Sequence, residues 1–220
     1  MTRHKMLFLD TETTGLDITR HEVWEFAAIE VNNDNHIYAL GKEHHLVWEP
    51  TWLEEADPGA IKVNHYYERT ARMGDVEEVI EWDDLVDTTG QTFSDPADAA
   101  KYIARLCEDA ILIGNNPAFD EMFLAKFCRD QAQVLAPFHR KINVVDMALQ
   151  RCIDMAHNHA DADLRRSAQE AVHLPHSSTK VLDAAGCPKN ENPHTALGDA
   201  KHVQQAFRHL WGTYDVRGAT

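Results

Sequence analysis

The sequence predicts an α/β fold in which a central β-sheet is flanked by α-helices. After about residue 95, amphipathic helical patterns alternate with short apolar runs, an order typical of sheets covered by helices. The chain has 220 residues, and its 44% hydrophobic and 26% charged residues are typical of a soluble globular protein with a sizeable core. Because no repeat or linker-like tract interrupts it, we expect one domain over residues 1–220.

The first half of the chain is expected to supply several strands. The apolar run 6–9 predicts a short buried strand. The segments 22–31 and 36–40 predict two more strands, joined as a hairpin through the turn-forming sequence NNDN. The segment 45–50 is expected to continue the sheet until Pro50 ends it.

An acidic helical insertion is expected near residues 66–92. Within it, residues 75–87 carry seven acids and no basic residue. The apolar residues of this stretch recur at roughly helical spacing, which predicts an amphipathic helix with a solvated acidic face. They are Val76, Val79, Ile80 and Leu85.

The second half predicts alternating helices and strands. A helix over 94–109 is expected to be capped by Ser94 or Asp95, with Pro96 in its first turn. The remaining elements expected are a buried strand over 110–114, a helix over 119–130, a strand over 142–146, a helix over 147–160 and a last helix over 195–211.

Charge and cysteine content restrict the function classes. A net charge of −15 argues against strong non-specific binding to nucleic acid or anionic lipid, but it is compatible with divalent cations. The four cysteines are scattered and form no C-x-x-C pair, which is typical of a reduced, cytoplasmic protein without a zinc knuckle. We expect no membrane partner, because the sequence has neither a signal-peptide pattern nor an apolar run of membrane-spanning length.

Two acids stand one residue apart where the first apolar run ends. Asp10 and Glu12, in LFLDTETTGL, would point to the same side of a strand. Two such carboxylates can share a hard cation such as Mg²⁺, and ligands gather at the carboxyl ends of strands in open α/β sheets. The alternative is a solvated strand end, and the D-x-E pattern alone does not decide between the two.

Three more polar residues occupy comparable places later in the chain. Asp120 follows a strand and a turn at the start of a helix, where an acid also complements the helix dipole. His194 and Asp199 are five positions apart, so they converge only if His194 precedes a helix and Asp199 lies in its first turns. Pro193 favours that entry. The alternative is an exposed loop histidine beside a first-turn acid.

In this order, the segments resemble the three motifs of the DEDDh 3′–5′ exonucleases, a family that includes proofreading exonucleases, RNase T and oligoribonuclease. The D-x-E motif followed by T-G stands here as DTETTGL, the second motif as NPAFD (116–120) and the third as HTALGD (194–199). Residues 59–66 resemble the loop between the first two motifs. Asn115 departs from the histidine that the family often has there. The resemblance implies an RNase H-like mixed sheet and nucleic acid hydrolysis.

The resemblance also implies a role for each motif residue. Two divalent ions, Mg²⁺ or Mn²⁺, would be held by Asp10, Glu12, Asp120 and Asp199, with Asp10 bridging both. His194 would act as the general base on the attacking water, since imidazoles titrate near neutral pH. The residues implied to contact the last two nucleotides are Thr11, Thr13, Leu16, Asn116 and Phe119.

The expected function is therefore a 3′–5′ exonuclease that removes nucleoside 5′-monophosphates from single-stranded or frayed 3′ ends of DNA. An exoribonuclease or oligoribonuclease is the alternative, and a non-catalytic polymerase accessory protein is a rival that the intact motifs disfavour. The expected partners are a nucleic acid 3′ end and a DNA polymerase or other replication protein. The segment 157–163 has side chains suited to Zn²⁺ or Ni²⁺, but we interpret it as a solvated helix end.

Overall fold

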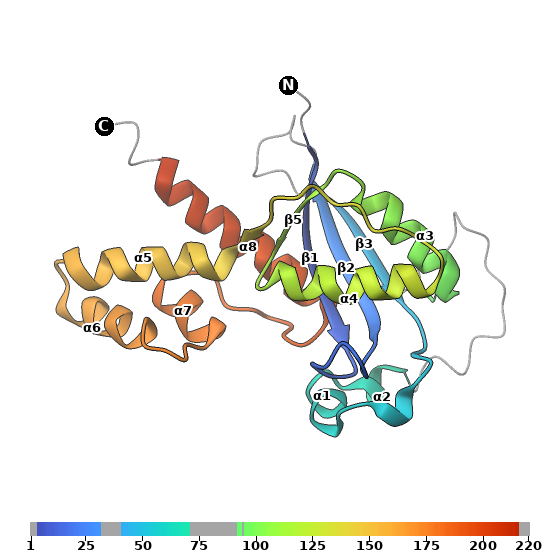
Figure 1. Cartoon of the computed structure of the whole chain (residues 1–220). Helices are drawn as coiled ribbons and strands as arrows, with labels where there is room; N and C mark the ends of the chain where they lie inside the picture. The colour runs from blue at the N-terminus through green and yellow to red at the C-terminus, as the bar shows by residue number, and fades with distance from the viewer. Residues whose placement is uncertain (1–3, 32–40, 71–91, 94, 216–220) are drawn as a thin grey trace.

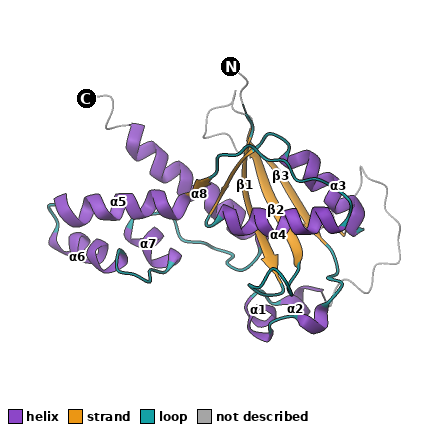
Figure 2. Ribbon diagram, viewed as in Figure 1, coloured by secondary structure: helices purple, strands orange, loops and turns teal. Residues whose placement is uncertain are grey.

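A mixed six-stranded sheet with helices on both faces confirms the predicted α/β class (Figures 1 and 2). The computed structural model describes residues 4–31, 41–70, 92–93 and 95–215. Its strands are β1 (Met6–Thr13), β2 (Val23–Val31), β3 (Lys42–Val47), β4 (Thr92–Phe93), β5 (Ile111–Gly114) and β6 (Ile142–Asn143). Its helices are η1 (Leu53–Glu55), α1 (Pro58–Val63), α2 (Tyr66–Thr70), α3 (Pro96–Cys107), α4 (Pro117–Asp130), α5 (Val144–Asn158), α6 (Ala162–Ala171), α7 (Ser178–Ala184) and α8 (Ala196–Asp215).

The strand order is β4-β3-β2-β1-β5-β6. The pairs β1–β2 and β2–β3 are antiparallel, whereas β1–β5, β5–β6 and β3–β4 are parallel. The central position of β1 places its carboxyl end beside the start of β2 and beyond the end of β5. Side chains from several segments can therefore meet there.

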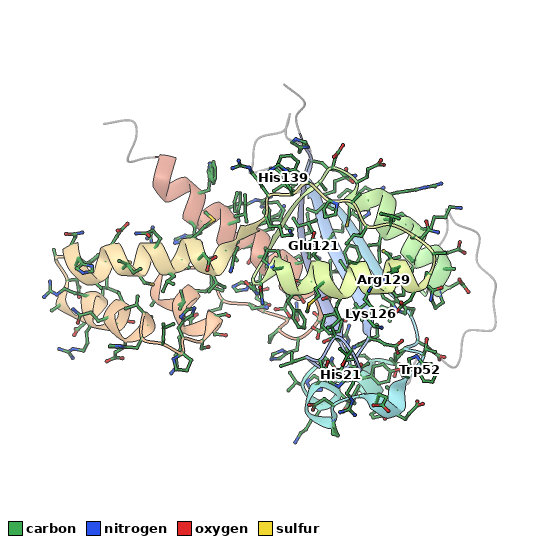
Figure 3. All side chains as sticks on the ribbon, viewed as in Figure 1. His21, Trp52, Glu121, Lys126, Arg129 and His139 are labelled. Carbon is green, nitrogen blue, oxygen red and sulfur yellow. The ribbon has the colours of Figure 1, made fainter. Side chains whose placement is uncertain are left out.

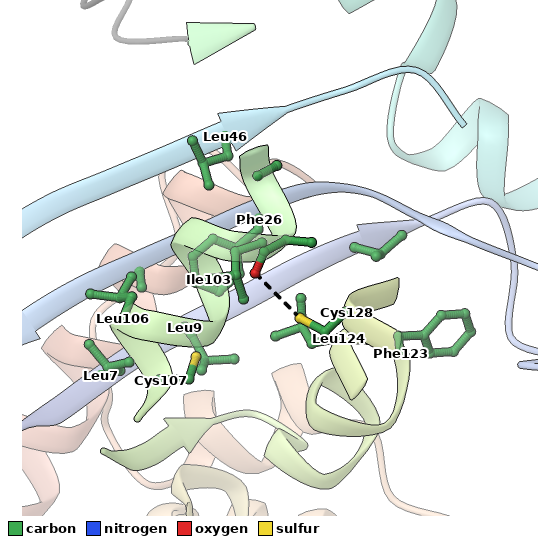
Figure 4. Close-up of a cluster of buried hydrophobic side chains, with 14 of the residues drawn as sticks. Leu7, Leu9, Phe26, Leu46, Ile103, Leu106, Cys107, Phe123, Leu124 and Cys128 are labelled. Carbon is green, nitrogen blue, oxygen red and sulfur yellow. Dashed lines mark hydrogen bonds between the residues drawn. The ribbon is translucent and has the colours of Figure 1, made fainter. Parts of the chain in front are cut away.

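One face of the sheet is covered by α3 and α4. Leu7 and Leu9 of β1 pack with Phe26 of β2, Ile103 of α3 and Leu124 of α4 in a buried apolar cluster (Figure 4). Within the same cluster the Cys128 thiol donates to the Ala100 carbonyl at 3.7 Å, which joins the two helices. This face is therefore apolar.

The opposite face is covered by α8. Met6 and Phe8 of β1, whose side chains alternate with those of Leu7 and Leu9, pack against Val203 and Phe207 of α8. Asp10 and Glu12 continue this even-numbered series, so the strand periodicity directs both carboxylates toward the beginning of α8.

A helical lobe stands beside the sheet. Helices α5, α6 and α7 pack on one another and on the later part of α8, and Figure 1 shows them to one side of the strands. Cys152, Val181 and Leu210 lie in its buried core. The helix predicted over 147–160 corresponds to α5, whereas α6 and α7 were not predicted from the sequence.

Most predicted elements are confirmed with shifted ends. The strands 22–31 and 110–114 match β2 and β5, and the last helix begins at Ala196, just after His194. Asp95 caps α3, because its side chain accepts the Ala97 N–H at 2.8 Å. The strand 36–40 and the acidic helix within 75–87 lie outside the described residues.

Two predicted boundaries are wrong. The strand 6–9 continues to Thr13, because Asp10 to Glu12 pair in register with β2 despite their polarity. The strand 142–146 ends at Asn143, whose side chain accepts the Val145 N–H at 2.9 Å and so starts α5. Local capping there overrides the strand preference of the β-branched residues. No helix in the described ranges has both the length and the apolarity needed to cross a bilayer.

Candidate active site

Three carboxylates from distant parts of the sequence converge at the end of β1. Asp10 and Glu12 come from β1, and Asp199 comes from the first turn of α8. Each offers an oxygen that lies within 4.8 Å of the oxygens offered by the other two. All three residues are partly buried. This cluster is the one group of metal-ligand type found among the described residues.

Small residues bring α8 close enough for this contact. Ala27 of β2 stands directly across from Asp10, and it packs against Ala196 and Ala200 of α8. A larger side chain at any of these three positions would separate the helix from the sheet. The alanines therefore help to set the distance between Asp199 and Asp10.

The third motif forms a tight turn before α8. The Thr195 hydroxyl accepts the Gly198 N–H at 3.1 Å, which is an N-cap contact. A Cβ at Gly198 would lie 2.1 Å from the Asn192 carbonyl oxygen, so this position excludes any larger residue. The turn ties Asp199 closely to the loop that carries His194.

His194 lies on this loop and is exposed to solvent. Its φ of 63° is in the left-handed region. Its N–H donates to Asp199 Oδ2 at 2.9 Å, and the Asn190 amide donates to Asp199 Oδ1. The arrangement predicted from the spacing is confirmed, because His194 precedes the helix and Asp199 lies in its first turn.

Asp120 reaches the same region from the first turn of α4. Its side chain is buried, and its Oδ1 accepts the Thr11 hydroxyl at 2.8 Å. Its charge acts on both Asp10 and Asp199. Asp120 is nevertheless not a member of the three-carboxylate group, so the structure brings together three of the four predicted metal ligands most tightly.

The acids of this site have raised pKa values. Burial raises the pKa of Asp10 well above its usual range, and the neighbouring charge of Asp120 raises it further. Burial and then the charge of Glu25 raise the pKa of Glu12 to about 8. Burial also raises the pKa of Asp120 to about 7 and that of Asp199 in the same direction. Such a set of carboxylates lacks sufficient positive charge.

A divalent cation fits this donor set. Hard ions such as Mg²⁺ and Mn²⁺ prefer carboxylate oxygens, and no cysteine contributes to the cluster. A bound ion would favour the ionised form of each acid, which burial and mutual repulsion disfavour.

The residues predicted to contact substrate differ in their exposure. Thr11 and Thr13 are buried on β1, whereas Leu16 is 80% exposed in the following turn. Asn116 is exposed at the N-cap of α4 and Phe119 is half-buried in its first turn. Their assignment to nucleotide binding stays a prediction.

Three residues beside the cluster were not identified from the sequence. Glu25, on β2 opposite Glu12, is fully buried and binds both Arg69 of α2 and His45 of β3. A charged residue inside the otherwise apolar run VWEFAAI was the signal available in the sequence. Its two partners lie 20 and 44 positions away, so no local pattern connects them.

A hollow elsewhere on the surface contains none of the predicted site residues. It is lined by His21, Trp48, Trp52, Phe123 and Lys126, among others. Figure 3 shows Lys126 on α4, with His21 and Trp52 toward α1 and α2. The segment 157–163 forms no metal-ligand group either, in keeping with its interpretation as a helix end.

One family model matches the first part of the chain. The exonuclease family model RNase T matches residues 7–89, which contain the first motif. The structure then brings Asp199 of the third motif to Asp10 and Glu12. The match over residues 7–89 supports the resemblance to the DEDDh exonucleases that the motifs indicate. A comparison with curated proteins finds no match.

Solved structures of exonuclease I share the fold of this chain. The zinc-bound complex of Escherichia coli exonuclease I with single-stranded DNA aligns with a TM-score of 0.65 at 17% identity, over 98% of this chain and 42% of that chain. Its complex with a dT13 oligonucleotide gives 0.65 at 18% identity, with the same coverage of both chains. A product-bound exonuclease I gives 0.62 at 14% identity, over 96% of this chain and 44% of that chain. This chain therefore spans less than half the length of those proteins.

Proposed function

We propose that this chain is a divalent-metal-dependent 3′–5′ exonuclease that acts on single-stranded or frayed DNA ends and releases nucleoside 5′-monophosphates. The observation that carries the proposal is the convergence of Asp10, Glu12 and Asp199 into a partly buried acidic cluster whose pKa values are raised. Asp120 lies close enough to affect Asp10 electrostatically.

The chemistry requires water to attack the last phosphodiester. Two bound Mg²⁺ or Mn²⁺ ions would neutralise the phosphate and stabilise the attacking and leaving oxygens. Asp10, Glu12 and Asp199 would hold one ion, and Asp120, with Asp10, the other. A ring nitrogen of His194 takes the proton of the attacking water. The bond from phosphorus to the 3′ oxygen breaks, which leaves a new 3′-hydroxyl and a free nucleotide.

The bound nucleotides would contact the surface around the cluster. We assign the terminal nucleotide to Thr11, Thr13 and Leu16, and the preceding one to Asn116 and Phe119. Phe119 is half-buried against Phe123, with ring centroids 4.7 Å apart, so a base stacking there would meet a supported ring.

DNA is favoured as substrate because exonuclease I binds single-stranded DNA oligonucleotides in the matching structures. Their low identity to this chain keeps RNA as the second candidate. The charge of −15 favours a weak grip away from the metal cluster. A DNA polymerase or another replication protein in the cytoplasm would then deliver the 3′ end.

The direct test uses oligonucleotides labelled at the 5′ end, as DNA and as RNA, single- and double-stranded, with Mg²⁺ or Mn²⁺. We expect a ladder of products shortened from the 3′ end and free 5′-monophosphates, with single-stranded DNA cut fastest. A 3′-phosphate should block the reaction. Cleavage that persists in excess EDTA, or that starts internally, would contradict the proposal.

A further inference from the structure

A buried ion pair lies next to the carboxylate cluster. Glu25 is 0% exposed, and its Oε1 accepts hydrogen bonds from Arg69 Nη2 and from His45 Nε2, the latter at 2.7 Å. Burial alone would raise the pKa of Glu25, but the His45 hydrogen bond and the Arg69 charge hold it below its usual range. We call Glu25, Arg69 and His45 the buried triad.

Arg69 also contacts two loops. Its Nη1 donates to the carbonyl oxygen of Asn64 at 3.3 Å and to that of His194 at 3.4 Å. Its guanidinium lies 4.9 Å from the centroid of the Trp24 ring. A planar guanidinium can make these contacts at once because its donors point in fixed, different directions, whereas a lysine ammonium cannot.

Both loops lead to the active site. The Asn64 amide donates to the Thr13 carbonyl at 3.1 Å, and its proximity lowers the pKa of Glu12 against the effect of burial. The backbone of His194 is held from two sides, by Asp199 at its N–H and by Arg69 at its carbonyl. One of these two anchors is a predicted metal ligand, and the other belongs to the buried triad.

We propose that Arg69 is a positioning residue for His194, held in place by the buried triad so that the loop presents the imidazole to the attacking water. This inference rests on the proposed function. Since His194 is exposed and has a left-handed backbone, its orientation depends on these backbone anchors. Small displacements of a catalytic group lower the rate steeply.

Substitution of Arg69 tests the proposal. We expect Arg69→Met to lower kcat about 10- to 100-fold, the usual range for residues that orient a catalytic group, with little change in KM. Arg69→Lys should recover little of the rate, because it restores charge without the fork of donors. The matched control is Arg129→Met, which removes an exposed arginine at the end of α4 and should leave kcat unchanged.

Arg69 also compensates Glu25, so a second variant separates the two effects. Glu25→Gln in the Arg69→Met background removes the uncompensated buried carboxylate and should restore the melting temperature but not kcat. Arg69→Met should also have little further effect on kcat in the His194→Ala background, because the two residues act as a unit.

The outcomes distinguish this inference from the proposed function. Recovery of kcat in the double variant, or additive losses with His194→Ala, would overturn the positioning role while the wild-type protein still degrades DNA. A folded wild-type protein without Mg²⁺- or Mn²⁺-dependent cleavage would overturn the proposed function and the positioning role together.

Discussion

Glu25 on β2 and the motif acids Asp10 and Glu12 on β1 lie on the α8 face of the sheet, one strand apart, and their pKa values shift in opposite directions. Glu25 on β2 is fully buried and bonded to Arg69 and His45, and its pKa is lowered. The motif carboxylates on β1, α4 and α8 have raised pKa values. None of the four motif acids forms a salt bridge with a basic side chain of the described residues.

The difference indicates two uses of buried charge. The chain supplies Glu25 with its own cation, because an unpaired buried charge is strongly destabilising. Where four carboxylates are left without one, an external cation has to complete the site. Unpaired acids beside a paired one are thus evidence for a metal site, in addition to the motif.

The largest effect is expected from removing a motif carboxylate. Asp10→Asn should reduce cleavage by at least about 10³-fold, equivalent to about 4 kcal/mol of transition-state stabilisation. The variant should stay folded and, in EDTA, melt at a higher temperature than the wild type, because one of several repelling acids is gone. Nuclease assays and thermal unfolding of the same samples check both. A variant that melts lower than the wild type in EDTA would show that the acids do not repel one another.

A smaller loss is expected at the residue that links the motif acids to the partner of Glu25. His194 contacts Asp199 through its N–H and Arg69 through its carbonyl. His194→Ala should lower kcat by about 10²- to 10⁴-fold and remove the acid limb of the pH–rate profile, with substrate binding retained. Initial-rate assays from about pH 5 to about pH 9 measure this. An unchanged profile would mean that His194 is not the base.

The pH dependence of stability should have opposite signs for Glu25 and for the motif acids. Glu12 and Asp120 have folded-state pKa values of about 8 and about 7, above their unfolded values, so metal-free protein should lose stability as pH rises from about 4 to about 8. When the folded and unfolded pKa values of a group differ by one, the difference corresponds to about 1.4 kcal/mol of stability. The pKa of Glu25 is lower in the folded protein than in the unfolded chain. Glu25 therefore stabilises the folded protein at pH values above its unfolded-state pKa, and this stabilisation is lost as the pH falls through its folded-state pKa.

Melting temperatures in EDTA across this pH range, for wild type, Glu12→Gln and Glu25→Gln, test the signs. The loss at high pH should shrink in Glu12→Gln and on addition of Mg²⁺. It should also shrink in Glu25→Gln, because the charge of Glu25 helps to raise the pKa of Glu12, but only Glu25→Gln should alter the acid side. If Glu12→Gln lost as much stability at high pH as the wild type does, the loss could not be assigned to the raised pKa of Glu12.

The smallest effect is expected from the surface charges that lie away from Glu25 and the motif acids. With 21 Lys and Arg against 36 Asp and Glu, few phosphate contacts are expected, and therefore a shallow salt dependence and distributive cleavage. When a labelled 50-mer is bound first and the reaction is started with Mg²⁺ and excess unlabelled competitor, the labelled strand should lose one or a few nucleotides. Long degradation in a single encounter would contradict the charge argument.

The places of the motif acids in the fold could be predicted because each acid belongs to a short sequence pattern. The strand periodicity placed Asp10 and Glu12 on one side, and the spacing of His194 and Asp199 implied a helix start between them. The resemblance, rather than the spacing, joined these segments into one site. The convergence with Asp199 depends on packing of Ala27 against Ala196 and Ala200, which no local pattern shows.

The compensated set could not be predicted for the same reason. Glu25, His45 and Arg69 come from β2, β3 and α2, and only the register of the strands and the position of α2 bring them together. The end of β1 was also missed, because polar residues in TET hide a strand that its pairing with β2 sustains. Long-range contacts decide both cases.

The most direct test of the account is calorimetric titration of Mn²⁺ into metal-free protein at pH 7.5. Wild type should bind Mn²⁺, Asp10→Asn should lose most of that affinity, and Asp183→Asn, an exposed acid of α7, should bind as wild type does. Asp10→Asn binding Mn²⁺ as tightly as wild type, or a wild type that binds none, would contradict the claim that the uncompensated acids form a metal site.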